Sequence, residues 1–322
     1  MAPVRARFLA LAALLAGSFT HAARAQGLPA YTPINPAAAS RTALGFEPYR
    51  TPHPGSWRAE VALDYASAIE HDLTADSHFD LDAELLRVRI RVGRDLGPRA
   101  FVQLDGEVGG SYPGFLDGFL DWYHGLLGID LPERDRRPRD AFLYEIDPRG
   151  GEVLDRRPSS FNLGDTRVSA GLRLTPGLQT LATVTLPTST APAGYGHGVV
   201  AAGLITTVRT PIARPVVYEG SLGLGYTPTH GDLAAYQRTT YVSASSGVRW
   251  RFWGRQSLYG NLFYHNPYYH DTDVRALDRR ELSFDFGWML ATHGRGEWRV
   301  GMTEDLEPGG PGIDLVFRLG WN

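Results

Sequence analysis

The last eleven residues of the chain, 312–322, alternate between two kinds of position. Large apolar groups occupy every second position, namely Ile313, Leu315, Phe317, Leu319 and Trp321. The positions between them include both charged residues of the segment, Asp314 and Arg318. Because successive side chains of a strand point to opposite faces, one face of this segment is apolar and the other is charged. Such a strand, ending one residue after an aromatic, is typical of a barrel wall between lipid and water.

The same period of two recurs along most of the chain after Trp57. A soluble sandwich also alternates, but here arginines and carboxylates are mixed on the polar face, which suits a lumen closed by ion pairs. We predict an all-β fold, a transmembrane antiparallel up-and-down β-barrel of about twelve strands over residues 55–322. The expected strands are 57–68, 79–92, 99–110, 162–174, 178–187, 199–209, 215–227, 237–252, 256–265, 281–292, 297–306 and 312–321. Short connections alternate with longer ones, as in barrels whose termini both lie in the periplasm.

The N-terminus has the three parts of a secretory signal peptide. Arg5 and Arg7 precede an apolar run, and Ala23-Arg24-Ala25 forms a cleavage site of the A-x-A type. We therefore expect residues 1–25 to be cleaved. Residues 26–54 are rich in proline and alanine, and we expect a poorly ordered periplasmic lead there. These features predict a bacterial outer-membrane protein. Its expected partners are outer-membrane lipid, periplasmic export chaperones and the barrel-assembly machinery.

Composition excludes several classes of site. The chain has no cysteine, which excludes disulfides and thiolate metal sites. It carries 32 basic and 35 acidic residues, so no basic stripe is available for nucleic acid. Seven histidines fall in expected external loops or at strand ends: His71, His78, His124, His197, His230, His265 and His270. Their spacing matches no ligand motif, and the sequence predicts neither a metal nor a cofactor.

The polar faces supply candidates for a charged lumen. In the second strand, Asp80, Asp82 and Glu84 share one phase, while Arg87, Arg89 and Arg91 share the other. Both sets can face inward only if a β-bulge near Leu85-Leu86 shifts the phase, and we expect one. The lumen and selectivity candidates are Asp82, Glu84, Arg87, Arg89, Arg91, Asp105, Glu107, Arg167, Arg173, Arg249, Asp285, Arg299, Asp314 and Arg318. They could fill a narrow barrel with ion pairs or form a constriction that selects solutes.

The connection 111–161 is long and holds the one helical pattern. Aromatic and leucine side chains recur at helical spacing from Phe115 to Leu127, so we expect one amphipathic helix in a long external loop. The helix could cover the barrel rim or fold into the mouth as a plug. The candidates for this role are Phe115, Asp117, Phe119, Asp121, Trp122 and His124.

No catalytic constellation is evident. An outer-membrane lipid hydrolase needs a nucleophile, a base and an orienting group close together near the outer leaflet. The hydroxyls expected on the lipid face (Ser67, Thr166, Thr206 and Ser246) have no neighbouring histidine, and no G-x-S-x-G or H-E-x-x-H motif occurs. We expect no catalytic residues and no enzyme activity.

Several short motifs resemble those of the bacterial DUF3187 family of outer-membrane proteins. They are Leu28-Pro29, Asn35-Pro36, the stretch Phe115–Gly125 and Leu186-Pro187-Thr188. The resemblance spans most of the chain after the signal peptide. It implies a transporter-like barrel but no established activity, and no functional residue is carried over from it. Within the motifs, the stretch Phe115–Gly125 is the one we expect to carry family-specific function, through Asp117, Asp121, Trp122 and His124.

Three functions are therefore open. The first is a passive pore for small solutes with a charged lumen. The second is a structural or adhesive barrel with a filled lumen, and the third is a lipid-modifying enzyme. The sequence favours the pore.

Overall fold

The computed structural model describes residues 27–127, 140–148, 154–155, 158–213, 215–293, 296–307, 310–313 and 315–322. The expected signal peptide and Asp314 lie outside this range. Among the described residues, no helix is long and apolar enough to cross a membrane.

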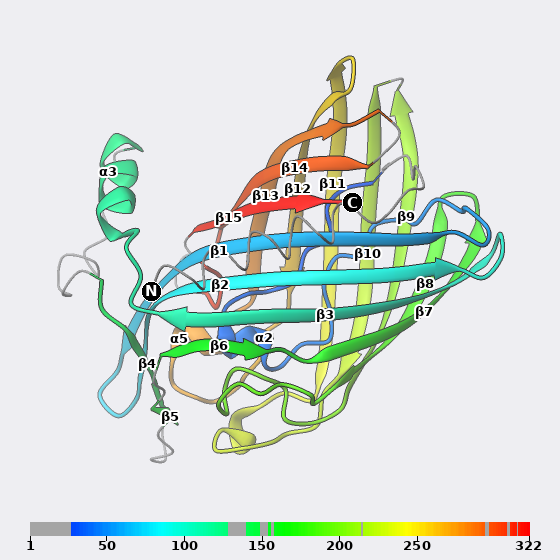
Figure 1. Ribbon diagram of the computed structural model, residues 1–322. Helices are drawn as coiled ribbons and strands as arrows, with labels where there is room; N and C mark the ends of the chain where they lie inside the picture. Colours follow the sequence, from blue (N-terminus) through cyan, green and yellow to red (C-terminus); the bar gives the residue numbers. More distant parts are fainter. Residues whose placement is uncertain are drawn as a thin grey trace.

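The described residues form a closed barrel of 12 antiparallel strands, as the alternation predicted (Figure 1). The wall consists of β1 (Trp57–Leu73), β2 (His78–Asp95), β3 (Ala100–Tyr112), β7 (Thr166–Thr175), β8 (Leu178–Leu186), β9 (Ala201–Ala213), β10 (Val216–Tyr226), β11 (Thr240–Trp253), β12 (Gln256–His265), β13 (Glu281–Ala291), β14 (Glu297–Asp305) and β15 (Leu315–Trp321). The terminal strand β15 pairs with β1 from Val61↔Trp321 to Ser67↔Leu315, which closes the barrel. Closure leaves the wall without an unpaired edge.

The two ends of the barrel differ. Short turns connect strands at one end, for example between Asp95 and Ala100 and between Trp253 and Gln256. We call this the turn end and the opposite one the loop end. At the loop end, the long connection after β3 contains α3 (Asp117–Leu127), β4 (Leu143–Asp147), β5 (Leu154–Asp155) and β6 (Ser159–Leu163). Two shorter connections hold η1 (Ala234–Tyr236) and α5 (Arg275–Asp278).

The wall separates an apolar outside from a polar inside, as expected. Outward side chains such as Leu104, Leu222 and Val300 are at least half exposed. Inward side chains such as Asp64, Asp285 and Arg318 are buried within the barrel. Exposed tryptophans, among them Trp57 and Trp253, lie at the turn end, where amphipathic rings mark a membrane interface.

Candidate functional site

The segment that precedes the barrel lies inside it. We had expected residues 26–54 to be a poorly ordered periplasmic lead, and that prediction is wrong for the described part, 27–54. Its apolar residues, including Leu28, Tyr31, Leu44 and Phe46, are almost completely buried. The wide lumen of such a barrel has to be filled by water or by protein, and here apolar lead residues fill much of it. We call residues 27–54 the lead.

The lead rises from the turn end to the loop end and returns. Near its start, Leu28 donates its backbone N–H to Glu219 at 3.2 Å, low on β10. Higher up, the Tyr31 hydroxyl donates to Glu281 at 2.7 Å, at the loop end of β13. The returning limb pairs with the rising one through a bridge between Tyr31 and Phe46. The blue trace inside the barrel in Figure 1 follows this path.

At the top of this excursion the lead forms the short helix α2 (Pro36–Ala39). The Asn35 side chain caps it by accepting from the Ala37 N–H at 3.0 Å, and proline at the first helical position suits the start of a helix. Arg41 follows and is buried. Its Nη2 donates to the carbonyls of Thr227, Pro228 and Arg238 at 3.1, 3.0 and 3.2 Å. These contacts tie the lead to the connection between β10 and β11, residues 227–239, at the loop end.

The barrel wall is shaped to receive Leu44 of the lead. Glycines on β9 and β10 surround it, and a Cβ atom at position 225 would lie 2.9 Å from Leu44 Cγ. Larger residues at these wall positions would collide with the leucine. The wall and the lead are therefore complementary in shape, which explains why inward glycines interrupt the alternation there.

In the middle of the lumen, a buried ion-pair cluster holds the rising limb. Asp64 of β1 pairs with Arg318 Nε at 2.7 Å and with Arg87 Nη2 at 2.9 Å. Arg318 also reaches Asp285 at 3.0 Å. Arg87 donates in addition to the carbonyl of Pro33 in the lead at 2.7 Å. Paired buried charges that also satisfy backbone carbonyls fix the position of a segment.

A second cluster holds the returning limb. Glu47 of the lead accepts from Arg91 at 2.8 Å and lies 3.8 Å from Arg167. Arg91 also pairs with Asp105 of β3. At the turn end, Asp95 pairs with Arg50 of the lead at 2.8 Å and with Arg173 at 2.6 Å.

Most predicted lumen residues therefore face the lumen. In addition to those above, Arg249 pairs with Glu297, Arg299 pairs with Glu60 at 2.7 Å, and Glu107 lines an internal cavity. The sequence analysis missed Asp64, Asp95 and Glu47 as partners. Asp64 and Asp95 lie in phase with their strands and could have been found there. Glu47 could not, because it lies in the lead.

The predicted β-bulge in β2 is absent, and the acids before it face outward. β1 and β2 pair without a register shift from Trp57↔Arg94 to Leu73↔His78. Since Arg87 faces inward, Asp82 and Glu84 must face outward, so their assignment to the lumen is wrong. The inward positions of this part of β2 are Phe79, Leu81, Ala83 and Leu85, which are buried. They pack with Leu44 and other apolar residues at the loop end.

This reversal of polarity has a simple physical cause. Near the turn end, the outside of β2 carries Val88 and Ile90. At the loop end, the outside carries acids and the inside carries an apolar core. The long loop after β3 covers this outer face, where Glu84 is buried and accepts the backbone N–H of Phe115, so the reversal marks where the wall emerges from the apolar layer.

The predicted helix α3 lies outside the barrel, at the end where β4 also lies (Figure 1). The Phe119 ring lies 5.9 Å from that of Phe317 on the outer face of β15, and Tyr123 donates to Glu304 at 3.3 Å. Phe115 stacks near Tyr65, and its backbone N–H donates to the outward Glu84 at 2.7 Å. Trp122 is 61% exposed. The helix therefore covers the rim, and the described part of the loop does not plug the mouth.

The polar loop residues have separate places. Asp117 accepts from the backbone N–H of Asp140 at 2.7 Å. Asp121 lies in the same helix, and the side chain of His124 is outside the described residues.

Several cavities lie between the described lead and the wall, and two of them share lining residues. One, of 180 Å³ at the loop end, is lined by residues that include Arg41, Tyr144 and His230. The other, of 70 Å³, lies deeper and is lined by Arg87, Arg89, Arg91 and Arg167 together with Asp105 and Glu107. Asp165 and His197 line both. Because they share these residues, the two cavities adjoin, and together they extend from the loop end to the arginines of β2.

His197 connects this passage to the lead. One ring nitrogen lies 2.9 Å from Asp165, and the other lies 3.0 Å from the carbonyl of Thr42. Burial raises the pKa of the Asp165 carboxyl, but hydrogen bonds from the His197 side chain and backbone outweigh it, so the pKa is lower than usual. Asp165 is therefore a carboxylate at neutral pH.

Among the described residues, buried arginine donors without a hydrogen-bond partner outnumber buried carboxylate acceptors without one. Among the described residues, six buried arginine nitrogens lack a hydrogen-bond partner, on Arg41, Arg50, Arg58, Arg89, Arg209 and Arg299. Only two buried carboxylate oxygens do, on Glu219 and Asp285. Arg41 and Arg89 are on cavity walls. A ligand that brings acceptor oxygens would satisfy these donors.

Comparison with known proteins agrees with this architecture. A family model described as "Protein of unknown function (DUF3187)" matches residues 17–322. No curated protein matches. The COG4313 outer membrane channel from Pseudomonas putida F1 is similar in structure, with 13% identity, a TM-score of 0.54, and coverage of 85% of this chain and 96% of that one.

Two further structures are more distant. The NanC porin shares 6% identity over 82% of this chain and 98% of its own, with a TM-score of 0.47. The Pseudomonas putida toluene transporter TodX shares 10% over 84% and 88%, with a TM-score of 0.40. The similarity to the first of these structures shows that the barrel fold is shared with an outer-membrane channel.

Proposed function

The chain belongs to the DUF3187 family, and we propose that it is an outer-membrane channel for small anionic or acceptor-rich solutes, closed by its own lead. On this proposal the turn end faces the periplasm and the loop end faces the outside. The observation that carries the proposal is the pair of adjoining cavities that leads from the loop end to Arg87, Arg89, Arg91 and Arg167. A passage lined by converging guanidinium groups suits solutes that carry carboxylate, phosphate or sulfate groups.

The charge of the deeper cavity supports this solute class. Its wall contains four arginines (Arg87, Arg89, Arg91 and Arg167) and three acids (Asp105, Glu107 and Asp165). Among the side chains that line this space, the arginines outnumber the carboxylates by one. Cations would meet the arginine side of this wall, whereas an anion would accept a hydrogen bond from Arg89, whose Nε makes only a 3.4 Å ion pair with Asp64.

In the described conformation the lead obstructs the passage. Its residues Thr32, Pro33, Thr42 and Leu44 form one side of the deeper cavity. A volume of 70 Å³ holds only a few water molecules. Passage of a solute therefore requires the lead to move away from the wall of β2, β3 and β7.

A covalent lock tests this requirement directly. The chain has no cysteine, and the closeness of Leu44 to position 225 places a disulfide between Leu44→Cys and Gly225→Cys within reach. We expect current through planar bilayers from the wild type and from the reduced double variant. Oxidation should remove it and reductant should restore it. The reduced form is the matched control, because it has the same two substitutions.

A barrel with a permanently filled lumen is the second candidate, favoured by the many polar contacts of the lead. If the wild type carries no current while a variant without the lead does, the permanently filled barrel is the better description. Equal currents in the oxidised and reduced double variants would contradict gating by the lead while leaving a pore.

Selectivity tests the solute class. Arg89→Gln removes one cation from the deeper cavity, and Arg94→Gln removes one from the outer face of the same strand, where Arg94 stacks on Trp57. One unit charge at about 5 Å in a watery passage attracts an anion and repels a cation by about 0.8 kcal/mol each, so the anion-to-cation permeability ratio should fall about 15-fold in Arg89→Gln. Arg94→Gln should leave the reversal potential unchanged. Equal effects of the two would contradict an arginine-lined route.

A further inference from the structure

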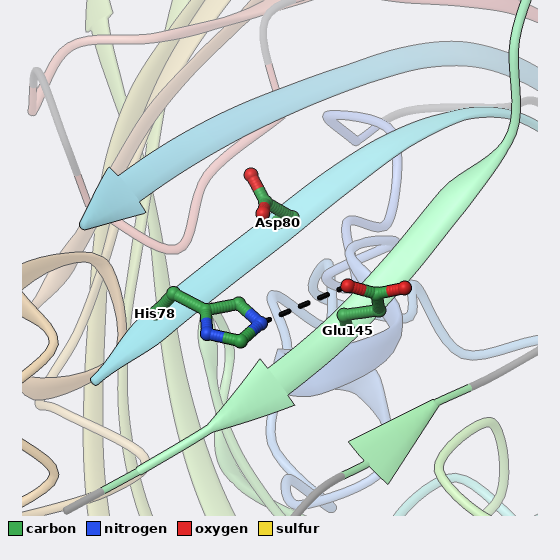
Figure 2. A group of neighbouring side chains, drawn as sticks. All are labelled: His78, Asp80 and Glu145. Carbon is green, nitrogen blue, oxygen red and sulfur yellow. Dashed lines mark ion pairs between the residues drawn. The ribbon is translucent and has the colours of Figure 1, made fainter. Parts of the chain in front are cut away.

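Outward side chains at the loop end of β2 form a group separate from the lumen. His78 and Asp80 lie on one face of β2, and Glu145 lies beside them on β4 (Figure 2). One ligand atom from each of the three lies within 4.8 Å of the others. Nε2 of His78 is 3.7 Å from Glu145. These distances exceed direct hydrogen bonds and leave room for an ion between the groups after small side-chain rotations.

The strand register explains how this group is assembled. His71 of β1, Asp80 of β2 and Glu145 of β4 are direct cross-strand partners in one row. Asp80 and Glu145 are therefore like charges placed opposite each other, an arrangement that destabilises a strand pair. Because β4 pairs with β2 over only five residues, Leu143 to Asp147, this repulsion falls on a short ladder. A divalent cation between the carboxylates would replace the repulsion with two bonds.

The neighbouring groups suit a metal site in a further respect. His71 Nδ1 lies 2.5 Å from Asp80, and Asp147 lies 3.9 Å from His78 Nδ1, on the other side of the ring from Glu145. In metal sites, a ligating histidine has its second nitrogen oriented by a carboxylate, and a ligating carboxylate is held by a hydrogen-bond donor. Asp147 and His71 occupy these two supporting positions.

We propose that His78, Asp80 and Glu145 bind a divalent transition metal, of which Zn²⁺ is the representative, with Asp147 and His71 as supporting residues. One imidazole and two carboxylates provide three protein ligands and leave a fourth position for water. The imidazole favours Zn²⁺ over Ca²⁺, which takes oxygen ligands and a larger coordination number. This departs from the sequence-based expectation of no metal, because spacing alone cannot bring Glu145 next to Asp80.

The bound metal would hold β4 in place, and β4 contributes Tyr144 to the lining of the 180 Å³ cavity at the loop end. Tyr144 precedes Glu145 and points to the opposite face, where it lines the 180 Å³ cavity and donates to the Gly194 carbonyl at 3.2 Å. A metal bound outside β4 therefore holds Tyr144 in place inside. The site is independent of whether the barrel conducts, since it stands on the outer face.

Calorimetric titration of the untagged full-length mature protein in detergent with Zn²⁺ tests the proposal. We expect one equivalent to bind, with Ca²⁺ at the same concentration giving no saturable heat. His78→Ala and Glu145→Gln should abolish binding, and Asp147→Asn should weaken it by about 10- to 100-fold, the usual effect of removing a supporting group. Zn²⁺ should also raise the melting temperature of the wild type.

The matched control is His270→Ala. His270 is also a loop-end histidine with a carboxylate neighbour, Asp271 at 2.9 Å, but among the described residues it belongs to no three-ligand group. This variant should bind Zn²⁺ as the wild type does. Far-UV circular dichroism verifies that each variant retains its strands. Binding that survives in folded Glu145→Gln and His78→Ala, or that falls equally in His270→Ala, overturns the assignment.

Discussion

Two segments are not part of the barrel wall, the lead and the long loop after β3, and they differ in whether they enter the lumen. The loop contains the stronger structural signal, an amphipathic helix with aromatic residues at regular spacing. Nevertheless α3 lies outside, with Phe115 and Trp122 more than 60% exposed. The lead has no periodic pattern, yet it occupies the lumen with Leu28, Tyr31 and Phe46 buried.

The difference follows from what each surface requires. The lumen is lined by charges, glycines and small residues, so the segment that fills it must offer both backbone carbonyls and scattered apolar groups. The lead does so, since Arg87 binds its carbonyls and Leu44 fits against wall glycines. The long loop instead meets the outer side of the rim, where Phe119 lies against Phe317 while Trp122 and Leu126 stay exposed. A helical period therefore predicts the helix but not a central position for it.

Deletion of the lead should have the largest effect on conductance, and replacement of α3 should have none. Removing residues 27–48, with residues 1–26 retained for export, should raise single-channel conductance roughly tenfold, because the lumen of a twelve-stranded barrel is then filled by water. Replacing Asp117–Leu127 of α3 with a glycine-serine linker of equal length should leave conductance unchanged. Planar-bilayer recordings of both variants provide the measurement.

The two recordings distinguish whether the lead or the long loop limits conductance. An increase in conductance from the linker variant alone would place the barrier in the loop and contradict the role assigned to the lead. Heat-dependent gel mobility verifies that both variants form barrels before they are compared.

Single substitutions should separate the two segments by stability. Arg41→Ala removes a buried cation that serves three carbonyls, and hydrogen bonds from charged groups contribute enough that a loss of about 2–4 kcal/mol is expected. Trp122→Ala, in the exposed face of α3, should change the free energy of unfolding by less than about 0.5 kcal/mol. Urea unfolding in detergent, followed by far-UV circular dichroism, measures both.

Arg41→Lys refines this test. A lysine retains the charge but lacks the planar fork, so it should recover part of the loss. Comparable costs for Arg41→Ala and Trp122→Ala would show that the lead is held no more firmly than the rim helix.

The wall was predictable from the sequence, and these two segments show where prediction ended. Alternation identified all the wall strands, since each has to present one face to lipid and one to the lumen over its length. In β15, for example, Phe317 faces outward and Arg318 faces Asp64, as the sequence indicated. The inward arginines of β2 were likewise correct.

The sequence did not predict two features of the structure. One is the change in what covers the outer face of β2 along its length, and the other is the set of ion-pair partners that the lead provides. Alternation shows that Glu84 and Arg87 lie on opposite faces but not that the long loop after β3 replaces lipid outside Glu84. We therefore inferred a bulge instead of a wall whose polarity reverses. Glu47 and the carbonyls of Thr32 and Pro33 were missed as partners of the wall arginines because the lead has no repeating pattern.

The smallest expected effect concerns pH and His197, one of the histidines that contact the lead. Asp165 has a lowered pKa, so its contribution to stability is present above its ordinary value of 3.8 and is lost as pH falls through the lower value in the folded protein. Asp165→Asn should therefore cost about 1 kcal/mol at pH 7, the order of a hydrogen bond to a charged group. That cost should shrink as the pH is brought below 3.8, where the carboxylate of the unfolded chain takes up a proton, and disappear below the lower pKa of the folded protein. Asp117→Asn in the rim helix is the matched control, because that carboxylate also accepts a backbone N–H but does not touch the lead. Unfolding free energies of the three proteins at pH 7, 5 and 3 give the comparison. A cost for Asp165→Asn that stays constant over this range would show that the carboxylate does not hold His197 against Thr42 through its charge.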